Sequence, residues 1–331
     1  MSDTGATRRP TRKQGWLRRA IGHVRTVAPT LRQKVAPPTP PPAELWRATV
    51  ANDRGDDIVY TGLLSEQGRR ETLVVLLHGL GGDVERGYCV AAASAARRAG
   101  LACLRLPLRG ADGTGKDLYH AGFTDDLAPL LSTSPIDEYE RIVLVGYSLG
   151  GHVALRAAID GVEDRLAAVA TVCAPLDLKA TQQAIDAPEA WLYRRYLLRG
   201  LKESYPSIAR GGPAPTPVDR VDAVTTLREW DSLTVVPRFG FRDVDDYYAS
   251  QSAGPRLGEI TIPVLFVASP ADPIVPADSL RGALSRAGRR TTVRWVRGGG
   301  HVFFPRTTNL GLGPNDGVEH QIMDWIGQST S

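Results

Sequence analysis

From residue 44 onward, short runs of apolar residues alternate with stretches in which apolar residues recur every three or four positions. The short runs predict β-strands and the periodic stretches predict helices. The first two strands are expected at residues 46–50 and 58–64, on either side of the turn residues 52–55. Beyond them, strands and helices are expected to alternate up to residue 173.

The alternating part predicts strands at residues 73–77, 101–106, 141–145 and 167–173, and helices at 84–99, 124–131 and 150–159. These strands are almost wholly apolar, which is typical of a parallel sheet covered by helices on both faces. The pattern resumes near the end of the chain with strands at 262–268 and 291–296 and helices at 277–287 and 318–326. It therefore predicts an α/β fold with a mostly parallel central sheet of about eight strands.

The alternation is interrupted over residues 175–259, between the sixth and seventh expected strands. Ordinary connections between sheet elements take only about 2 to 6 residues, so this segment is too long to be a simple connection. We expect a helical cap inserted over the carboxyl edge of the sheet. The predicted organisation is a tail at 1–43, a core at 44–174 and 260–331, and a cap at 175–259.

The tail carries most of the positive charge of the chain. Residues 1–34 contain nine lysines and arginines against a single acid, Asp3, so the tail is +8 and the rest is −4 of the net +4. A proline-rich spacer, residues 35–42, separates it from the core. The body therefore gives no electrostatic reason to expect a nucleic-acid partner.

Two interpretations of this tail remain open. Apolar residues at helical spacing among its arginines could lie on an anionic membrane surface: Trp16, Leu17, Ala20, Ile21 and Val24. A solvated, poorly ordered basic tail is the alternative.

The overall composition excludes several classes of protein. Hydrophobic residues at 42% and charged residues at 23% argue against a wholly disordered chain, a collagen or a coiled coil. No apolar run is long enough for a spanning helix or a secretory signal. Three irregularly spaced cysteines, Cys89, Cys103 and Cys173, suggest neither a zinc site nor a disulfide framework. We expect a soluble, cytoplasmic protein.

The strongest chemical motif is Gly-Tyr-Ser-Leu-Gly at residues 146–150, directly after an expected strand and before an expected helix. A serine at such a strand-to-helix turn is held in a strained conformation that exposes its hydroxyl group. The flanking Gly146 and Gly150 avoid side-chain collisions there. Ser148 is therefore the candidate nucleophile.

A serine hydroxyl needs a base, and in this architecture the acid and then the histidine follow the serine along the chain. His301, which follows the flexible residues 298–300, is the candidate base. Asp272, in the turn after the strand at 262–268, is the candidate acid that would orient the imidazole. Asp177 is the reserve acid.

Such a site also needs two backbone N–H groups that stabilise a developing oxyanion. Leu149, directly after the nucleophile, supplies one candidate amide, and Leu80 in the His-Gly-Leu-Gly-Gly segment at 78–82 supplies the other. That segment lacks the full spacing of a nucleotide-binding loop, so a phosphate-binding role is disfavoured.

The chain resembles the α/β-hydrolase superfamily over residues 45–327. Four features carry this resemblance: the His-Gly after the first parallel strand, the Ser148 turn, the Asp272 turn and Gly300-His301. Finer segments are similar to its YheT-type branch: residues 106–110, 119–122, 125–127, 227–231 and 240–248. Where that branch usually has Phe-Arg-Gly and His-Ser-Gly-Glu-Thr, this chain has Leu-Arg-Gly at 108–110 and His-Ala-Gly-Phe-Thr at 120–124. The resemblance implies an α/β-hydrolase fold and carboxylic-ester hydrolysis by Ser148, Asp272 and His301.

We therefore expect a serine hydrolase that acts on a moderately apolar or lipid-like ester, with no metal or organic cofactor. An acyltransferase or thioesterase with the same three residues is the enzymatic alternative. A binding protein that kept the fold and lost the activity is the alternative from another class. The expected partner is a small-molecule ester, with peripheral membrane contact through the basic tail left open.

Overall fold

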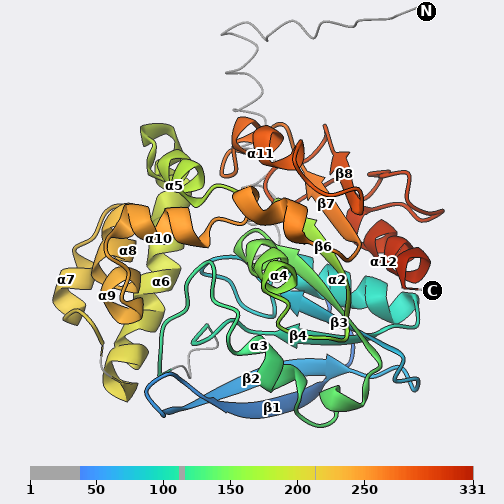
Figure 1. The fold of residues 1–331 in the computed structure, drawn as a ribbon, viewed down its shortest axis with the longest axis horizontal. Helices are drawn as coiled ribbons and strands as arrows, with labels where there is room; N and C mark the ends of the chain where they lie inside the picture. Colours follow the sequence, from blue (N-terminus) through green and yellow to red (C-terminus); the bar gives the residue numbers. More distant parts are fainter. Residues whose placement is uncertain (1–37, 112–115, 213, 331) are drawn as a thin grey trace, which may run out of the picture.

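A computed structural model describes residues 38–111, 116–212 and 214–330 of the chain. Its centre is an eight-stranded sheet in the order β1-β2-β4-β3-β5-β6-β7-β8. The helices lie on both faces of this sheet, and a group of helices from the middle of the chain gathers at one side (Figure 1). The predicted α/β class with about eight strands is confirmed.

The strands are β1 (Glu44–Ala51), β2 (Asp57–Ser65), β3 (Thr72–Leu77), β4 (Ala102–Leu106), β5 (Arg141–Tyr147), β6 (Leu166–Val172), β7 (Val264–Ala268) and β8 (Thr291–Trp295). β1 pairs antiparallel with β2, and β2 pairs antiparallel with β4. Every later neighbour in the sheet is parallel. Each strand falls where the hydrophobic pattern predicts one, with ends that differ by only a few residues.

The opening hairpin shows how local chemistry sets the turn. The side-chain Oδ1 of Asn52 accepts hydrogen bonds from the amides of Arg54 (2.9 Å) and Asp56 (2.8 Å), and Gly55 takes a positive φ of 81°. Along β1, buried and exposed residues alternate, as expected for an edge strand with one face on the core.

The parallel strands bury side chains on both faces, so the protein has two hydrophobic cores. On β3, Leu73, Val75 and Leu77 belong to the core that contains helix α4 (Leu149–Asp160). Val74 and Leu76 belong to the opposite core, with helices α2 (Gly87–Arg98) and α12 (Val318–Ser329). This two-sided burial explains why the strands read as continuous apolar runs.

Two predicted helices begin later than expected. The helix predicted from residue 84 begins at Gly87, because the chain first makes a turn in which the Asp83 carboxylate accepts from the Glu85 amide at 2.8 Å. The helix predicted from residue 124 is the short α3 (Leu127–Leu131), preceded by a turn closed by Leu127 N–H and the Thr124 carbonyl. The remaining core helix is α11 (Ala277–Leu284).

The segment between β6 and β7 is helical, as predicted for an insertion after the sixth strand. It contains α5 (Leu178–Asp186), α6 (Trp191–Gly211), α7 (Val218–Asp222), α8 (Leu227–Leu233), α9 (Val235–Phe239) and α10 (Val244–Gln251), with short 3-10 turns at Pro188–Ala190 and Gly254–Glu259. We call residues 175–259 the cap. In Figure 1 helices α6 to α10 lie together beside the sheet.

A buried ionic network ties the cap to the core. Arg238 of α9 donates through Nε to Asp117 at 2.6 Å and through Nη2 to Asp53 in the β1–β2 turn at 2.6 Å. Asp117 also accepts from Arg109 at 2.8 Å, and Arg109 forms a two-pronged pair with Asp126. Asp53 is exposed, whereas the other four side chains are buried. Because the buried charges are paired and hydrogen-bonded, the core tolerates them.

The sequence predicts a tail at residues 1–43. Its residues 1–37 lie outside the described residues, and so does the stretch around Trp16. Among the helices that the structure describes, none has the length and apolar content needed to cross a membrane.

Replacement of Arg238 by alanine should lower the free energy of unfolding by about 3 kcal/mol, because it leaves the buried Asp117 carboxylate short of a cation. Urea denaturation followed by circular dichroism measures this change. Arg242→Ala is the matched control, since that arginine is exposed on the same cap. Equal losses in the two variants would contradict the anchoring role.

Candidate active site

Ser148 lies at a sharp turn between β5 and α4, with φ of 52° and ψ of −118°. This positive φ is rare for a residue with a side chain and costs energy that the surroundings must supply. The backbone holds it there: Ser148 N–H donates to the Val172 carbonyl at 2.8 Å, and the Ser148 carbonyl accepts from the amides of Gly151 and His152.

Two glycines make this turn possible by letting backbones approach. A Cβ atom at Gly146 would lie 2.2 Å from the Gly150 carbonyl oxygen, and one at Gly150 would lie 2.3 Å from the Leu77 carbonyl oxygen. Neither contact is tolerable, and in both cases the obstacle is backbone that cannot move aside. The motif therefore needs glycine at both positions, which is the steric reason behind the predicted spacing.

The structure brings His301 and Asp272 together, although 29 positions separate them in the chain. His301 Nδ1 lies 2.8 Å from Asp272 Oδ2, and both side chains are buried. Because a carboxylate can only accept, Nδ1 carries the proton in this contact, which makes Nε2 the acceptor nitrogen in the neutral ring.

Asp272 is itself fixed by its own loop. Its Oδ1 accepts from the amides of Ile274 (2.8 Å) and Val275 (3.0 Å), leaving Oδ2 for the histidine. The Ser269 hydroxyl donates to the Gly299 carbonyl at 3.0 Å and so joins the Asp272 loop to the His301 loop. Asp272 is therefore oriented before any substrate binds.

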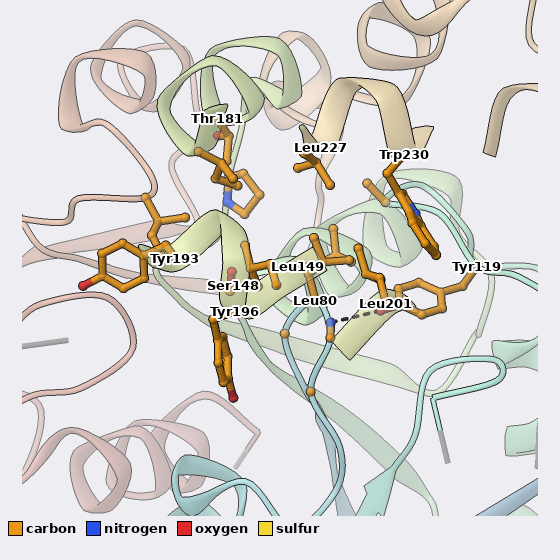
Figure 2. Close-up of a pocket in the computed structure, with 18 of the residues that line it drawn as sticks. Leu80, Tyr119, Ser148, Leu149, Thr181, Tyr193, Tyr196, Leu201, Leu227 and Trp230 are labelled. Carbon is orange, nitrogen blue, oxygen red and sulfur yellow. Dashed lines mark hydrogen bonds between the residues drawn. The ribbon is translucent and has the colours of Figure 1, made fainter. Parts of the chain in front are cut away.

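The loop after β3 is held in place by two tyrosines. The Gly79 amide donates to the Tyr88 hydroxyl at 3.1 Å, and the Gly81 amide donates to the Tyr119 hydroxyl at 3.3 Å. These bonds fix the chain on each side of Leu80, and Figure 2 shows the second of them beside Leu80 and Ser148.

A cavity of about 730 Å³ lies between the carboxyl ends of the strands and the cap. Its floor includes Leu80, Ser148, Leu149 and His301, and Asp272 joins this group through its bond to His301. Its walls come mainly from apolar and aromatic cap residues: Leu178, Ile185, Tyr193, Leu197, Leu201, Leu227, Trp230 and Val235. In Figure 2 several of these side chains surround Ser148. This is the usual place for a ligand in a parallel α/β sheet.

The reserve acid Asp177 and two basic side chains of the cavity lining, Arg109 and His120, have other roles. Asp177 caps the N-terminus of α5 by accepting from the Ala180 amide at 2.9 Å. Arg109 is buried and paired with Asp117 and Asp126, so its charge is already balanced. Burial lowers the pKa of His120 to about 3, which keeps its ring neutral near pH 7.

Among the described residues, Cys173, Asp272 and His301 form a group whose potential metal ligands lie within 4.8 Å of one another. Burial raises the pKa of the Cys173 thiol well above its ordinary value, so the thiolate needed for metal binding is disfavoured. The Asp272 and His301 atoms concerned already bond to each other. The three residues are therefore better explained by a hydrogen bond in which Asp272 orients His301 than by a metal site.

One acidic side chain of the cap stands out in the apolar wall. Asp231 of α8 lines the cavity and is 7% exposed. Burial and the nearby Asp186 carboxylate raise its pKa to about 7, and the hydrogen bond from Tyr248 offsets only part of that effect.

The sequence gives no sign that Tyr88 and Tyr119 support the Leu80 loop. Tyr119 and Asp231 stand out in it only as members of segments of family resemblance, at 119–122 and 227–231. Tyr88 follows the Gly79 loop by nine residues, but nothing in the sequence indicates that its hydroxyl turns back to that loop. Tyr119 lies in a segment without regular structure, where periodicity carries no information.

Asp231→Asn should raise the free energy of unfolding by about 4 kcal/mol at pH 8. The folded-state pKa of about 7 exceeds the ordinary value of 3.8, so between these pH values the unfolded chain releases the proton that the folded chain keeps. The folded chain with Asp231 therefore loses stability as the pH rises to about 7, and the amide variant does not. The gain should shrink as pH falls from 7 and vanish near pH 4. Urea denaturation across this pH range measures it, and a gain independent of pH would contradict the assignment.

Comparisons with curated proteins connect this chain to named hydrolases. It is 28% identical over 313 residues to the protein named "Putative esterase YheT" of Escherichia coli, covering 92% of this chain and 89% of that one. It is 25% identical over 237 residues to "Phospholipase ABHD3" of Homo sapiens, covering 70% of this chain and 58% of the human protein.

The folds agree with this relationship. The crystal structure of a 2,6-dihydroxy-pseudo-oxynicotine hydrolase superposes with a TM-score of 0.54 at 19% identity, covering 92% of this chain and 73% of that one. The sequence model described as the alpha/beta hydrolase family matches residues 74–308, which span the core strands from β3 onward, the cap, Ser148, Asp272 and His301. This chain therefore belongs to the alpha/beta hydrolase family.

Proposed function

We propose that this protein is a serine hydrolase that cleaves carboxylic esters through an acyl-enzyme. The observation that carries the proposal is that Ser148, at its strained turn, and His301, bonded to Asp272, meet at the floor of one cavity. A strained serine and an oriented imidazole at one cavity are what nucleophilic catalysis on an acyl group requires.

In the first step His301 takes the proton from the Ser148 hydroxyl as the oxygen attacks the ester carbonyl carbon. Nε2 is the accepting nitrogen, since Nδ1 faces Asp272. The imidazolium that forms lies beside the Asp272 carboxylate, which stabilises its positive charge. His301 then gives the proton to the departing alcohol, leaving the acyl group on Ser148.

The negative charge of the tetrahedral intermediate needs hydrogen-bond donors. Leu149 begins α4, so its amide points out of the positive end of that helix. The Leu80 amide is the second donor, and the tyrosine bonds to Gly79 and Gly81 keep its loop in position. A water molecule, activated by His301, then releases the acid and restores the serine.

The cavity favours a small-molecule ester with a substantial apolar part. Its cap-side wall is mostly leucine, isoleucine, tyrosine and tryptophan, which stabilise acyl chains by burial. The names of the two relatives, an esterase and a phospholipase, agree with an ester substrate.

Ser148→Ala and His301→Ala should each lower kcat for a short-chain nitrophenyl ester by about 10³–10⁵-fold, because each removes a group that acts only with the others. Asp272→Asn should lower kcat by a similar order, since an amide no longer selects the useful tautomer. Steady-state kinetics with matched circular dichroism spectra measures these losses.

Ser94→Ala is the control, since Ser94 lies on α2 and bonds only to its own helix through the Val90 carbonyl. Its kcat should stay within about twofold of wild type. Wild-type rates in folded Ser148→Ala would refute the mechanism.

A further inference from the structure

The Asp231 carboxyl group lies on the cap side of the cavity wall, where most lining residues are apolar or aromatic and Thr181, Gln182 and Ser204 are the uncharged polar ones. Leu227 and Trp230 of the same helix, and Val235 at the start of α9, line the wall beside it. Acidic side chains are almost never this buried unless a partner compensates them. A carboxyl group at such a position therefore needs an explanation.

Its partners within the protein are incomplete. The Tyr248 hydroxyl donates to Asp231 Oδ2 at 2.6 Å. Within residues 38–330 as described, no hydrogen bond reaches Asp231 Oδ1, and no lysine or arginine forms an ion pair with this carboxylate. Oδ1 is not among the fully enclosed polar atoms that lack a partner, and Asp231 lines the cavity, so a ligand there can supply the missing donor.

Asp231 does not cap its own helix, although its hydrogen bond from Tyr248 joins α8 to α10. The N-terminus of α8 is capped by Thr226 and Glu229, which form a reciprocal capping box. Asp231 lies past this first turn, and its raised pKa shows that burial outweighs the single bond from Tyr248.

The location also connects Asp231 to the reacting centre. Burial and the nearby Asp231 carboxylate raise the pKa of Tyr119. The Tyr119 hydroxyl accepts a hydrogen bond from the Gly81 amide in the Leu80 loop. Both Tyr119 and Asp231 line the same cavity as Ser148. An acyl chain attached at Ser148 and extending along the cap can therefore bring a polar substituent to Asp231.

We infer that Asp231 is a substrate-binding residue that selects esters whose acyl chain carries a hydrogen-bond donor, a hydroxyl or an ammonium group. This inference rests on the proposed ester hydrolysis and adds the substrate class. The donor bonds to Asp231 Oδ1 while Tyr248 keeps Oδ2, and the apolar wall packs against the methylene groups between the donor and the ester.

The test compares nitrophenyl esters of equal chain length with a plain, an ω-hydroxy or an ω-amino end. Wild type should prefer at least one donor-bearing ester over the plain ester by about tenfold or more in kcat/KM. Asp231→Leu, which keeps the branching of the side chain and removes its polar atoms, should abolish that preference and improve kcat/KM for the plain ester. Asp231→Asn, which is expected to be more stable than wild type, should also lose most of the preference for donor-bearing esters.

Asp222→Asn is the matched control, because Asp222 is an exposed acid of the cap outside the cavity lining. It should keep the wild-type preference. Comparison of the hydroxy and amino esters then identifies which donor the site takes. Equal kcat/KM for all three esters in wild type, or a preference that survives in Asp231→Leu, would overturn the inference.

A binding measurement separates this inference from the proposed catalysis. Calorimetry with Ser148→Ala should show tighter binding of an ω-hydroxy or ω-amino fatty amide than of the plain amide, and the difference should vanish when Asp231→Leu is added. If wild type cleaves no ester but this difference is present, the hydrolase proposal fails and the Asp231 site stands. If wild type cleaves esters but the amides bind equally tightly, the Asp231 inference fails and the hydrolase proposal stands.

Discussion

The structure depends above all on the close approach of backbones at the Ser148 turn. The turn works only because Gly146 and Gly150 let β5, α4 and the end of β3 pack without side chains between them. The sheet order places β5 between β3 and β6, and the Ser148 amide bonds to the last residue of β6. The parallel core thus supplies the energy that keeps one serine in a strained, accessible conformation.

The cap turns this exposed residue into an enclosed site. It adds an apolar wall above the floor formed by Ser148 and His301, and ionic bonds through Arg238 hold it against the core. His152, directly behind the serine on α4, has its ring nitrogens 2.8 Å from the Pro175 carbonyl and 2.9 Å from the Gln251 carbonyl, near the two ends of the cap. The helix that presents the nucleophile therefore also contacts both ends of the element that covers it.

The sequence predicts the parts of this arrangement that depend on residues close together in the chain. Apolar runs locate all eight strands, and the glycine spacing around Ser148 identifies the turn. The chain order of family members nominates Asp272 and His301, which the fold brings within 2.8 Å. It cannot predict that Tyr119 supports Gly81, or that Tyr248 is the one side-chain partner of Asp231 among the described residues, because these depend on contacts between segments separated in the chain. Helix starts at Gly87 and Leu127 were missed because local turns preceded them.

The central claim is that Ser148 is chemically activated, and covalent labelling tests it without knowledge of the substrate. Intact-mass analysis after incubation with a fluorophosphonate should show one adduct on the wild-type protein and none on Ser148→Ala. No adduct on folded wild-type protein, or an adduct that persists in the alanine variant, would contradict the account.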